Sequence, residues 1–176
     1  MANREALREL QARLATRLQA AQSEGMSVAW LAVKAGGGNY LLPLGQSGEI
    51  FPVSNLQPVP YAKAWFTGVL NIRGSLYGVV DLADFVATDS GSHRTAPALV
   101  ETSVITLNPL LEVNCAVQVD TLSGLRGSEA FTASTPPAPD APAYFGNRFL
   151  DSASLVWQEI NLRLLAQSPQ FLSIST

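Results

Sequence analysis

Residues 65–82 read WFTGVLNIRGSLYGVVDL, from Trp65 to Leu82, and decide how this chain folds. Two apolar segments flank the Gly74-Ser75 pair, which predicts two strands joined by a tight turn. Arg73, the one cation of the stretch, stands where the first strand ends. The chain's single histidine, His93, belongs to a later polar loop. We therefore interpret Arg73 as a residue held for pairing and recognition rather than for bond making.

The composition predicts a globular protein that does not bind nucleic acids. The chain has 176 residues, of which 47% are hydrophobic and only 14% charged, so it can bury one substantial core or two small fused ones. Its net charge is −3 and its pI is near 5.1. Phosphate binding favours clustered Lys and Arg, and here the basic residues are scattered. A nucleic-acid-binding small barrel is thus a less favoured alternative.

Cysteine usage and the apolar segments point to the cytoplasm. Cys115 is the single cysteine, so no intrachain disulfide can form, and its place inside an apolar strand predicts a buried, inert thiol. The longest apolar runs have the length of strands, which argues against a membrane-spanning helix and direct membrane insertion. No signal-like segment follows the N-terminus. We expect a cytoplasmic protein.

The N-terminal segment predicts a separate amphipathic helix. Within residues 3–24, leucines recur at three- and four-residue steps, and Gly25 ends the pattern. We divide the chain into this helix, residues 1–25, and a β-rich domain, residues 26–176. In the simpler interpretation, the leucine stripe packs on the helix's own domain. The same stripe would also serve to dock another protein.

The rest of the chain predicts strands joined by turns. Residues 28–34 and 40–44 form a hairpin around three glycines, and Glu49–Val53 is a short strand whose proline suggests a sheet edge. Later strands are expected at residues 99–107, 114–119, 122–126, 145–150 and 154–160, before a closing helix at residues 161–166. Residues 132–143 hold four prolines and are expected to form an exposed loop.

Carboxylates occur at strand ends, where capping explains them. Asp81 ends a strand and precedes a short helical segment, so it can cap that segment with Asp84 completing the cap. An enzyme using Asp81, Asp84 and Asp120 is an alternative that would need these carboxylates in one cleft. No G-x-S-x-G elbow, P-loop or dinucleotide glycine pattern occurs, and no cluster with metal-ligand spacing. The sequence predicts a protein that is not an enzyme.

A strand, a capping residue and a helix occur in that order twice, at Val79–Leu82 and at Glu159–Leu162. This echo predicts two similar β units, each closed by a short helix. It favours two small barrels over one large sheet.

The motifs at Tyr40–Leu44, Glu49-Ile50, Pro58–Pro60, Trp65–Gly74 and Val79–Leu82 together resemble the CheW-like chemotaxis coupling domain. Val104-Ile105 and Val117–Asp120 resemble the next paired strands of that family, so the resemblance covers roughly residues 27–166. The N-terminal helix and the ending from Trp157 to Leu172 look most like the PilI-type members, which serve type IV pilus (twitching) signalling. A flagellar chemotaxis system stays open, because the coupling domain is shared.

The resemblance implies a mostly β fold of two intertwined five-stranded SH3-like β-barrels with a hydrophobic core between them, plus the N-terminal α-helix and a short C-terminal helix. It implies an adaptor without a cofactor. Its partners would be the cytoplasmic tip of a methyl-accepting chemoreceptor and a CheA-like histidine kinase, at membrane-associated receptor arrays. The protein-binding residues carried over are Arg73 and Glu49, an ion pair beside a groove for the receptor helix, with Leu44, Val104 and Ile105 lining that groove.

Physical reasoning fits this assignment, and a plainer role for the ion pair also stays open. A docked helix gains affinity from apolar anchors, and a charged pair at the rim gives orientation. Alternatively, Glu49 and Arg73 pin two strands together. Two positions depart from the family pattern: Ser47 stands where many members have an apolar residue, and Gly78 where many have proline. Ser47 is expected to weaken one wall of the groove.

Overall fold

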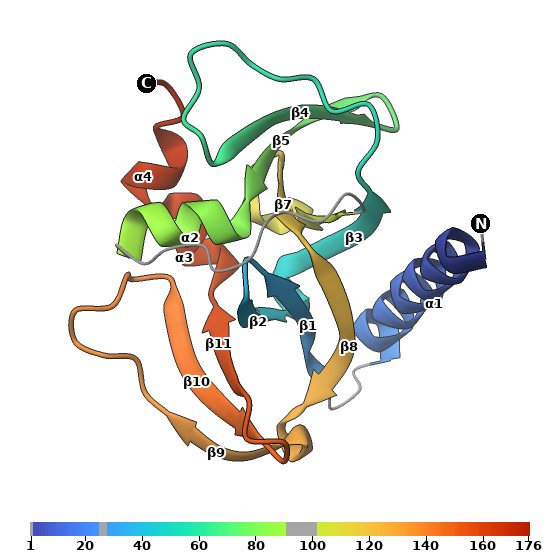
Figure 1. Cartoon of the computed structure of the whole chain (residues 1–176), viewed down its shortest axis with the longest axis vertical. Helices are drawn as coiled ribbons and strands as arrows, with labels where there is room; N and C mark the ends of the chain where they lie inside the picture. Colours follow the sequence, from blue (N-terminus) through green and yellow to red (C-terminus); the bar gives the residue numbers. More distant parts are fainter. Residues whose placement is uncertain (1, 25–27, 91–101) are drawn as a thin grey trace.

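The β4–β5 hairpin has the form that the sequence predicts, with its turn one residue earlier. In the computed structural model, which describes residues 2–24, 28–90 and 102–176, β4 is Phe66–Ile72 and β5 is Ser75–Asp81 (Figure 1). The turn is Arg73-Gly74, with φ of 51° and 85°, as a two-residue type I′ connection requires. The Asn71 side chain accepts a hydrogen bond of 2.9 Å from the Gly74 amide and holds the turn.

The remaining elements make the protein mostly β, as predicted. Before the hairpin come α1 (Ala2–Glu24), β1 (Val28–Ala35), β2 (Gly38–Pro43), the 3₁₀ helix η1 (Leu44–Gln46) and β3 (Ser47–Pro52). After it come α2 (Leu82–Ser90), β6 (Ser103–Leu107), η2 (Pro109–Leu111), β7 (Cys115–Val119), β8 (Thr121–Gly127), η3 (Ser128–Ala130), β9 (Phe131–Thr135), β10 (Phe145–Asp151), β11 (Val156–Ile160), α3 (Leu162–Gln167) and α4 (Pro169–Leu172).

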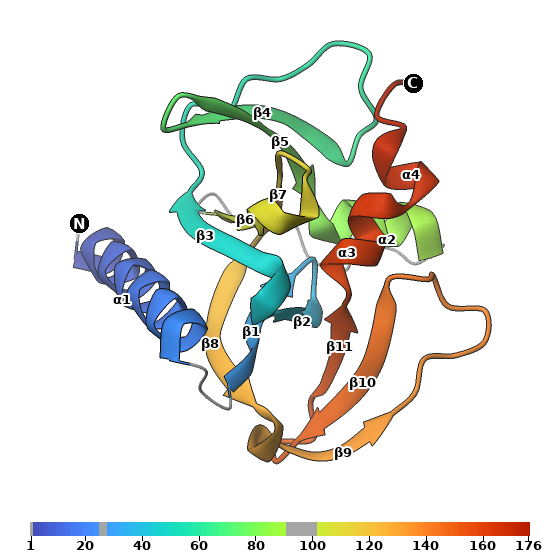
Figure 2. The ribbon, with the colours of Figure 1, turned by 180° about the vertical axis from the view of Figure 1, so that it is seen from behind.

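The strands form two sheets that interleave along the chain. The central sheet has the order β3-β6-β7-β5-β4, and the terminal sheet has the order β8-β1-β2-β11-β10-β9. The terminal sheet therefore takes two strands from before the central sheet and four from after it (Figures 1 and 2). This confirms the intertwined two-unit architecture. The expected count of five strands holds for the central sheet, whereas the terminal sheet has six.

The sixth strand exists because one long strand is interrupted. β8 pairs with β1 at one end of the terminal sheet, and β9 pairs with β10 at the other. Only η3 separates β8 from β9 in the chain, so one bent strand joins both ends of the sheet and curls it. The two ends of the central sheet are joined in the same way by one continuous segment. Its first part, β3, pairs with β6, and farther along the chain Gln57 forms a bridge to Val69 of β4.

The two sheets repeat one plan, which confirms the two similar β units predicted from the sequence echo. Each contains one parallel pairing, β5 with β7 and β11 with β2. Each of the strands β5 and β11 is followed by a short helix with its N-cap side chain in place: the amide of Asp84 donates to Asp81 Oδ1, and that of Leu164 to Asn161 Oδ1, both at 3.0 Å. The strand preceding each helix also ends alike, since the amides of Asp81 and Asn161 donate to the carbonyls of the residues just before β4 and β10.

The core lies mainly between the sheets. A large buried cluster combines residues of both, including Leu31, Val80, Ile105 and Ile160, and extends to an aromatic group of Trp65, Phe85, Tyr144 and Phe171 beside α2, α3 and α4. Two smaller clusters fill the curled sheets, one around Val104 and one around Trp157. This is the core between two barrels that the family resemblance implies.

The helix α1 packs on its own chain, as the simpler interpretation predicts. It contacts β3, β8 and η1 and lies alongside β3 and β8 in both views (Figures 1 and 2). Of the helix residues whose burial the structure describes, Leu14 and Leu18 are buried, whereas Leu10, part of the predicted stripe, is 46% exposed. Among the described helices, none is long and apolar enough to cross a membrane.

One sequence expectation about a loop is wrong in part. Residues 132–143 were expected to be loop throughout, but Thr132–Thr135 belong to β9. The strand forms because Phe131 packs against Trp30 and Phe149 in the terminal sheet's own cluster. The remaining residues of the segment lie outside regular helices and strands. His93 lies outside the described residues.

Candidate protein-docking site

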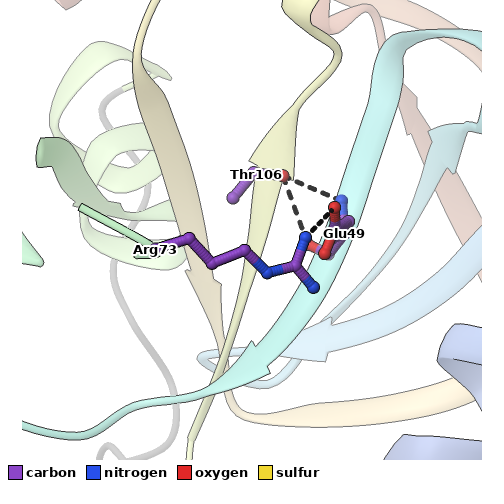
Figure 3. Close-up of polar contacts among 3 residues, drawn as sticks. All are labelled: Glu49, Arg73 and Thr106. Carbon is purple, nitrogen blue, oxygen red and sulfur yellow. Dashed lines mark hydrogen bonds and ion pairs between the residues drawn. The ribbon is translucent and has the colours of Figure 1, made fainter. Parts of the chain in front are cut away.

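The residue pair expected from the family resemblance is formed. Arg73 Nη1 donates to Glu49 Oε1 at 2.9 Å, and the two side chains are 71% and 38% exposed. Figure 3 shows the arginine extending from the β4–β5 turn to β3. Because β3 and β4 are the two ends of the central sheet, the pair links the edges of the sheet across its open side.

Neighbouring groups fix both partners. Thr106 Oγ1 accepts a hydrogen bond of 2.8 Å from the Glu49 amide, which holds β3 against β6 at this point (Figure 3). The Arg73 guanidinium carbon lies 5.6 Å from the centre of the Phe51 ring, within the range of a cation–π contact. Arg73 is thus anchored by a carboxylate and an aromatic face and keeps exposed N–H groups for another acceptor.

A small cavity opens beside the pair. It has a volume of about 230 Å³ and is lined by β3 and its continuation, by the end of β4, and by Arg73. Its apolar lining includes Phe51, Leu70 and Ile72, which belong to the cluster around Val104. A cavity of this size accepts one apolar side chain of a partner, with a cation at its rim.

The three apolar residues expected to line the receptor groove are buried in this structure. Val104 and Ile105 have no exposed surface, and Leu44 is nearly covered. Val104 packs in the cluster beneath the cavity, whereas Ile105 and Leu44 belong to the large core between the sheets. Successive residues of a strand point to opposite faces, so Val104 and Ile105 cannot line one groove together. Only Val104 backs the surface beside Arg73.

The two departures from the family pattern have local explanations. Ser47 is fully buried, and its hydroxyl donates to the Pro43 carbonyl at 2.9 Å, so it does not form part of an exposed wall as expected. Gly78 packs closely: a β-carbon there would lie 3.0 Å from the Phe66 ring and 3.6 Å from Cys115 Sγ.

Burial also raises the pKa of the Cys115 thiol to about 11, which keeps it protonated at neutral pH.

Two of the three carboxylates considered for catalysis, Asp81 and Asp120, accept hydrogen bonds from the backbone. Asp81 caps α2, as predicted, and Asp120, between β7 and β8, accepts a hydrogen bond of 2.8 Å from the amide of Gly36 in the β1–β2 turn. Within residues 2–24, 28–90 and 102–176, no group of three or more His, Cys, Asp and Glu side chains is arranged to hold a metal ion.

Sequence reasoning missed Phe51 and Thr106 as parts of the site. Both lie on β-strands one or two residues from positions that the family motif marks, Glu49 and Ile105. The period-two alternation of β3 could have indicated Phe51, because residues 49 and 51 share a strand face. Thr106 carried no such signal, since its role depends on how β6 aligns with β3.

Comparison with known proteins agrees with this architecture. The sequence matches the family model of the CheW-like domain over residues 29–145. It is 27% identical over 165 residues to Protein PilI of Pseudomonas aeruginosa, covering 93% of this chain and 89% of that protein. The fold is similar to the crystal structure of the scaffolding protein TtCheW from Thermoanaerobacter tengcongensis, with a TM-score of 0.62, 15% identity, and coverage of 82% of this chain and 96% of that one.

These findings assign the family. The match to the family model spans more than half of the 176 residues, and the fold is similar to that of the solved scaffolding protein. The chain therefore belongs to the CheW-like domain family, whose members are coupling adaptors of chemotaxis-type signalling.

Proposed function

We propose that this protein is a non-catalytic adaptor that couples the cytoplasmic tip of a methyl-accepting chemoreceptor to a CheA-like histidine kinase. One observation carries the proposal. Arg73 is an exposed arginine in the left-handed conformation, at a turn where Asn or Gly is the usual residue. Keeping a strained conformation at an exposed position points to a role outside the fold. The Glu49 carboxylate aims the guanidinium, and its free donors suit a carboxylate on a partner helix.

We place this adaptor in type IV pilus signalling. The proposal is supported by similarity over most of the chain to a protein named PilI and by the N-terminal helix. Such an adaptor would act in the cytoplasm, at membrane-associated receptor arrays. In a flagellar chemotaxis system the partners would be of the same two classes, so the binding experiment is performed with kinase and receptor fragments encoded in the same genome for each system.

The test measures binding of the purified chain to two fragments separately: the regulatory domain of the kinase and the cytoplasmic tip of the receptor. Arg73→Glu is expected to weaken receptor binding at least about tenfold, because it removes the rim cation and repels Glu49. The midpoint of unfolding should hardly move, since exposed ion pairs contribute about 0–1 kcal/mol. Arg163→Glu, an equal charge change on the exposed face of α3, is the control.

A charge exchange separates recognition from strand pinning. Glu49→Arg combined with Arg73→Glu restores an ion pair between the same strands but reverses the charge at the turn. If Arg73 recognises a partner, receptor binding stays weak in this double variant; if the pair only pins strands, binding recovers. Unchanged receptor binding by Arg73→Glu alone would remove Arg73 from the site, and absence of kinase binding by the unaltered chain would refute the adaptor role.

A further inference from the structure

The helix α1 packs on a surface that strands of both sheets form, and we call this surface the seat of α1. α1 packs on β3 of the central sheet, on β8 of the terminal sheet, and on η1 between β2 and β3. Leu14 and Leu18, 6% and 1% exposed, enter the same buried cluster as Leu44 and Ile50. The helix thus packs on strands of both sheets (Figure 2).

The first half of α1 is bordered by open cavities. Two cavities of about 190 and 200 Å³ both adjoin Leu7 and Gln11, one toward β8 and one toward the end of β3. A hydrogen bond of 2.6 Å from Gln11 Nε2 to Ser103 Oγ crosses the interface there. Of the helix side chains whose burial the structure describes, Leu14 and Leu18 are buried, Ala15 packs against the same cluster, and Gln11 supplies the hydrogen bond to Ser103.

Lifting α1 from its seat does not require unfolding it. The helix has 23 residues, rich in Ala, Leu, Arg, Gln and Glu, with neither Gly nor Pro inside. These residues have high helix propensity, and the length exceeds what an isolated helix needs to be marginally stable. Displacement consequently costs the burial of Leu14 and Leu18 rather than the helix itself. Such an element can be exchanged for a better-fitting helix.

We propose that the seat is a docking groove for an amphipathic helix of a partner, and that α1 occupies it as a tethered competitor. The occupant would carry two apolar anchors four residues apart, as Leu14 and Leu18 are, and a polar group three residues before the first, as Gln11 is. This inference rests on the proposed function, which supplies the partner helix: the receptor tip. The burial of Leu44, which the family resemblance assigns to the receptor groove, is then explained because α1 packs on η1.

The groove shares β3 with the ion pair. Glu49 holds Arg73 at the exposed side of this strand, while the neighbouring Ile50 enters the cluster that contains Leu14 and Leu18. A helix in the groove would therefore lie close to the charged rim. As long as α1 fills the groove in most molecules, the apparent affinity for a partner is the intrinsic affinity multiplied by the small fraction of molecules in which the seat is open.

The first test loosens α1 in the full chain. Leu14→Ala with Leu18→Ala removes both anchors, and Leu10→Ala is the control because that leucine is exposed. The probe is a fluorescein-labelled peptide with the sequence of residues 2–24. The loosened variant should bind this peptide, and the unaltered chain and the control should bind it at least tenfold more weakly. Binding of the receptor-tip fragment should become at least tenfold tighter in the loosened variant, and the unlabelled peptide should compete with it.

The second test closes the seat and guards against a loosened variant that misfolds. Gln11→Cys with Ser103→Cys, in a Cys115→Ala background, allows a short bismaleimide to fix α1 in place. Receptor-tip binding should fall at least tenfold after cross-linking, and kinase-domain binding should stay unchanged. Unchanged tip binding after cross-linking, or failure of the labelled peptide to bind a folded loosened variant, would overturn the groove. A receptor tip that binds no variant would instead refute the proposed function, since the peptide test needs no partner.

Discussion

At the scale of single residues, one glycine allows the central sheet to close. Gly68 has φ of 145°, and a β-carbon there would lie 2.2 Å from the Gln57 carbonyl oxygen. That carbonyl accepts from the Val69 amide at 2.8 Å, and the Gln57 amide donates back to Val69 at 2.9 Å. The bridge that joins the two ends of the sheet thus depends on the absence of a side chain at position 68.

Gly68→Ala is expected to destabilise the protein by roughly 1–3 kcal/mol from backbone strain alone, with the clash against Gln57 adding to it. The matched control is Gly45→Ala, since a β-carbon at Gly45 meets nothing within 4 Å; it should leave stability unchanged or raise it by up to about 1 kcal/mol. Urea unfolding monitored by circular dichroism gives both values. Equal stability of the two variants would show that the bridge does not close the sheet.

The hydrogen bonds of the Asp151 carboxylate imply that the stability of the protein depends on pH. Its carboxylate accepts from Trp157 Nε1 and from the amides of Leu155 and Ala153, each at 2.9 Å. The hydrogen bond from Trp157 and the two from the backbone lower the pKa of this carboxyl. A carboxyl with a lowered native pKa adds stability above its unfolded value of about 3.9, and this stability is lost as pH falls through the native value.

The stability difference between the unaltered chain and Asp151→Asn should therefore be constant at neutral pH. It should shrink as the pH falls below about 5, one unit above the unfolded pKa. Urea unfolding at a series of pH values from neutral to acidic measures it. Parallel stability curves over this range would mean that Asp151 does not titrate as its hydrogen bonds imply.

At this scale the sequence could predict some contacts and not others. The Glu49–Arg73 pair was predicted, because a family motif marks both positions even though 23 residues separate them. Burial of Leu44 and Ile105 was not, because it depends on how two distant strands and α1 cover them. The fully buried Ser47 shows the same limit: it was expected in one wall of the groove, but its hydroxyl donates to the carbonyl of Pro43, four residues earlier.

At the scale of elements, the two strand–helix units invite a direct comparison of caps. Asp81 and Asn161 accept from the amides three residues on, in α2 and α3. Replacing such a cap by alanine typically costs about 1 kcal/mol. Asp81→Ala and Asn161→Ala should each destabilise by roughly that amount. Arg163→Ala, on the exposed face of α3, should stay within about 0.5 kcal/mol.

The measurement is the free energy of unfolding in urea for the three variants. A stable Asn161→Ala protein would indicate that the burial of Leu162 and Leu165 and the hydrogen bond from the Leu162 amide to Gln46 Oε1 are enough to hold α3. The caps and the helices after them were predictable, because they depend on neighbours in sequence. β9 was not, because its single apolar anchor, Phe131, finds its partners on β1 and β10.

At the scale of the whole molecule, the interleaving of the sheets should make unfolding cooperative. The strands of the terminal sheet come before and after those of the central sheet in the chain, and residues of both sheets form the large core. Neither sheet can therefore unfold without exposing the core residues of the other. Trp65 reports the shared core, and Trp30 and Trp157 report the terminal sheet. In Trp65→Phe, and in Trp30→Phe with Trp157→Phe, urea midpoints from fluorescence and far-UV circular dichroism should coincide within each variant. Separate midpoints would reveal sheets that unfold independently.

The strand order of the terminal sheet also has a consequence on the ribosome. β1 and β2 are synthesised first, but the strands that pair with their outer edges, β8 and β11, come only after the whole central sheet. At roughly 5–20 residues per second, the early hairpin waits on the order of 4–16 seconds before β8 begins to emerge. During that interval its apolar residues are available to other proteins. A nascent chain stalled after β7 should therefore bind chaperones, and release them once β11 has left the exit tunnel.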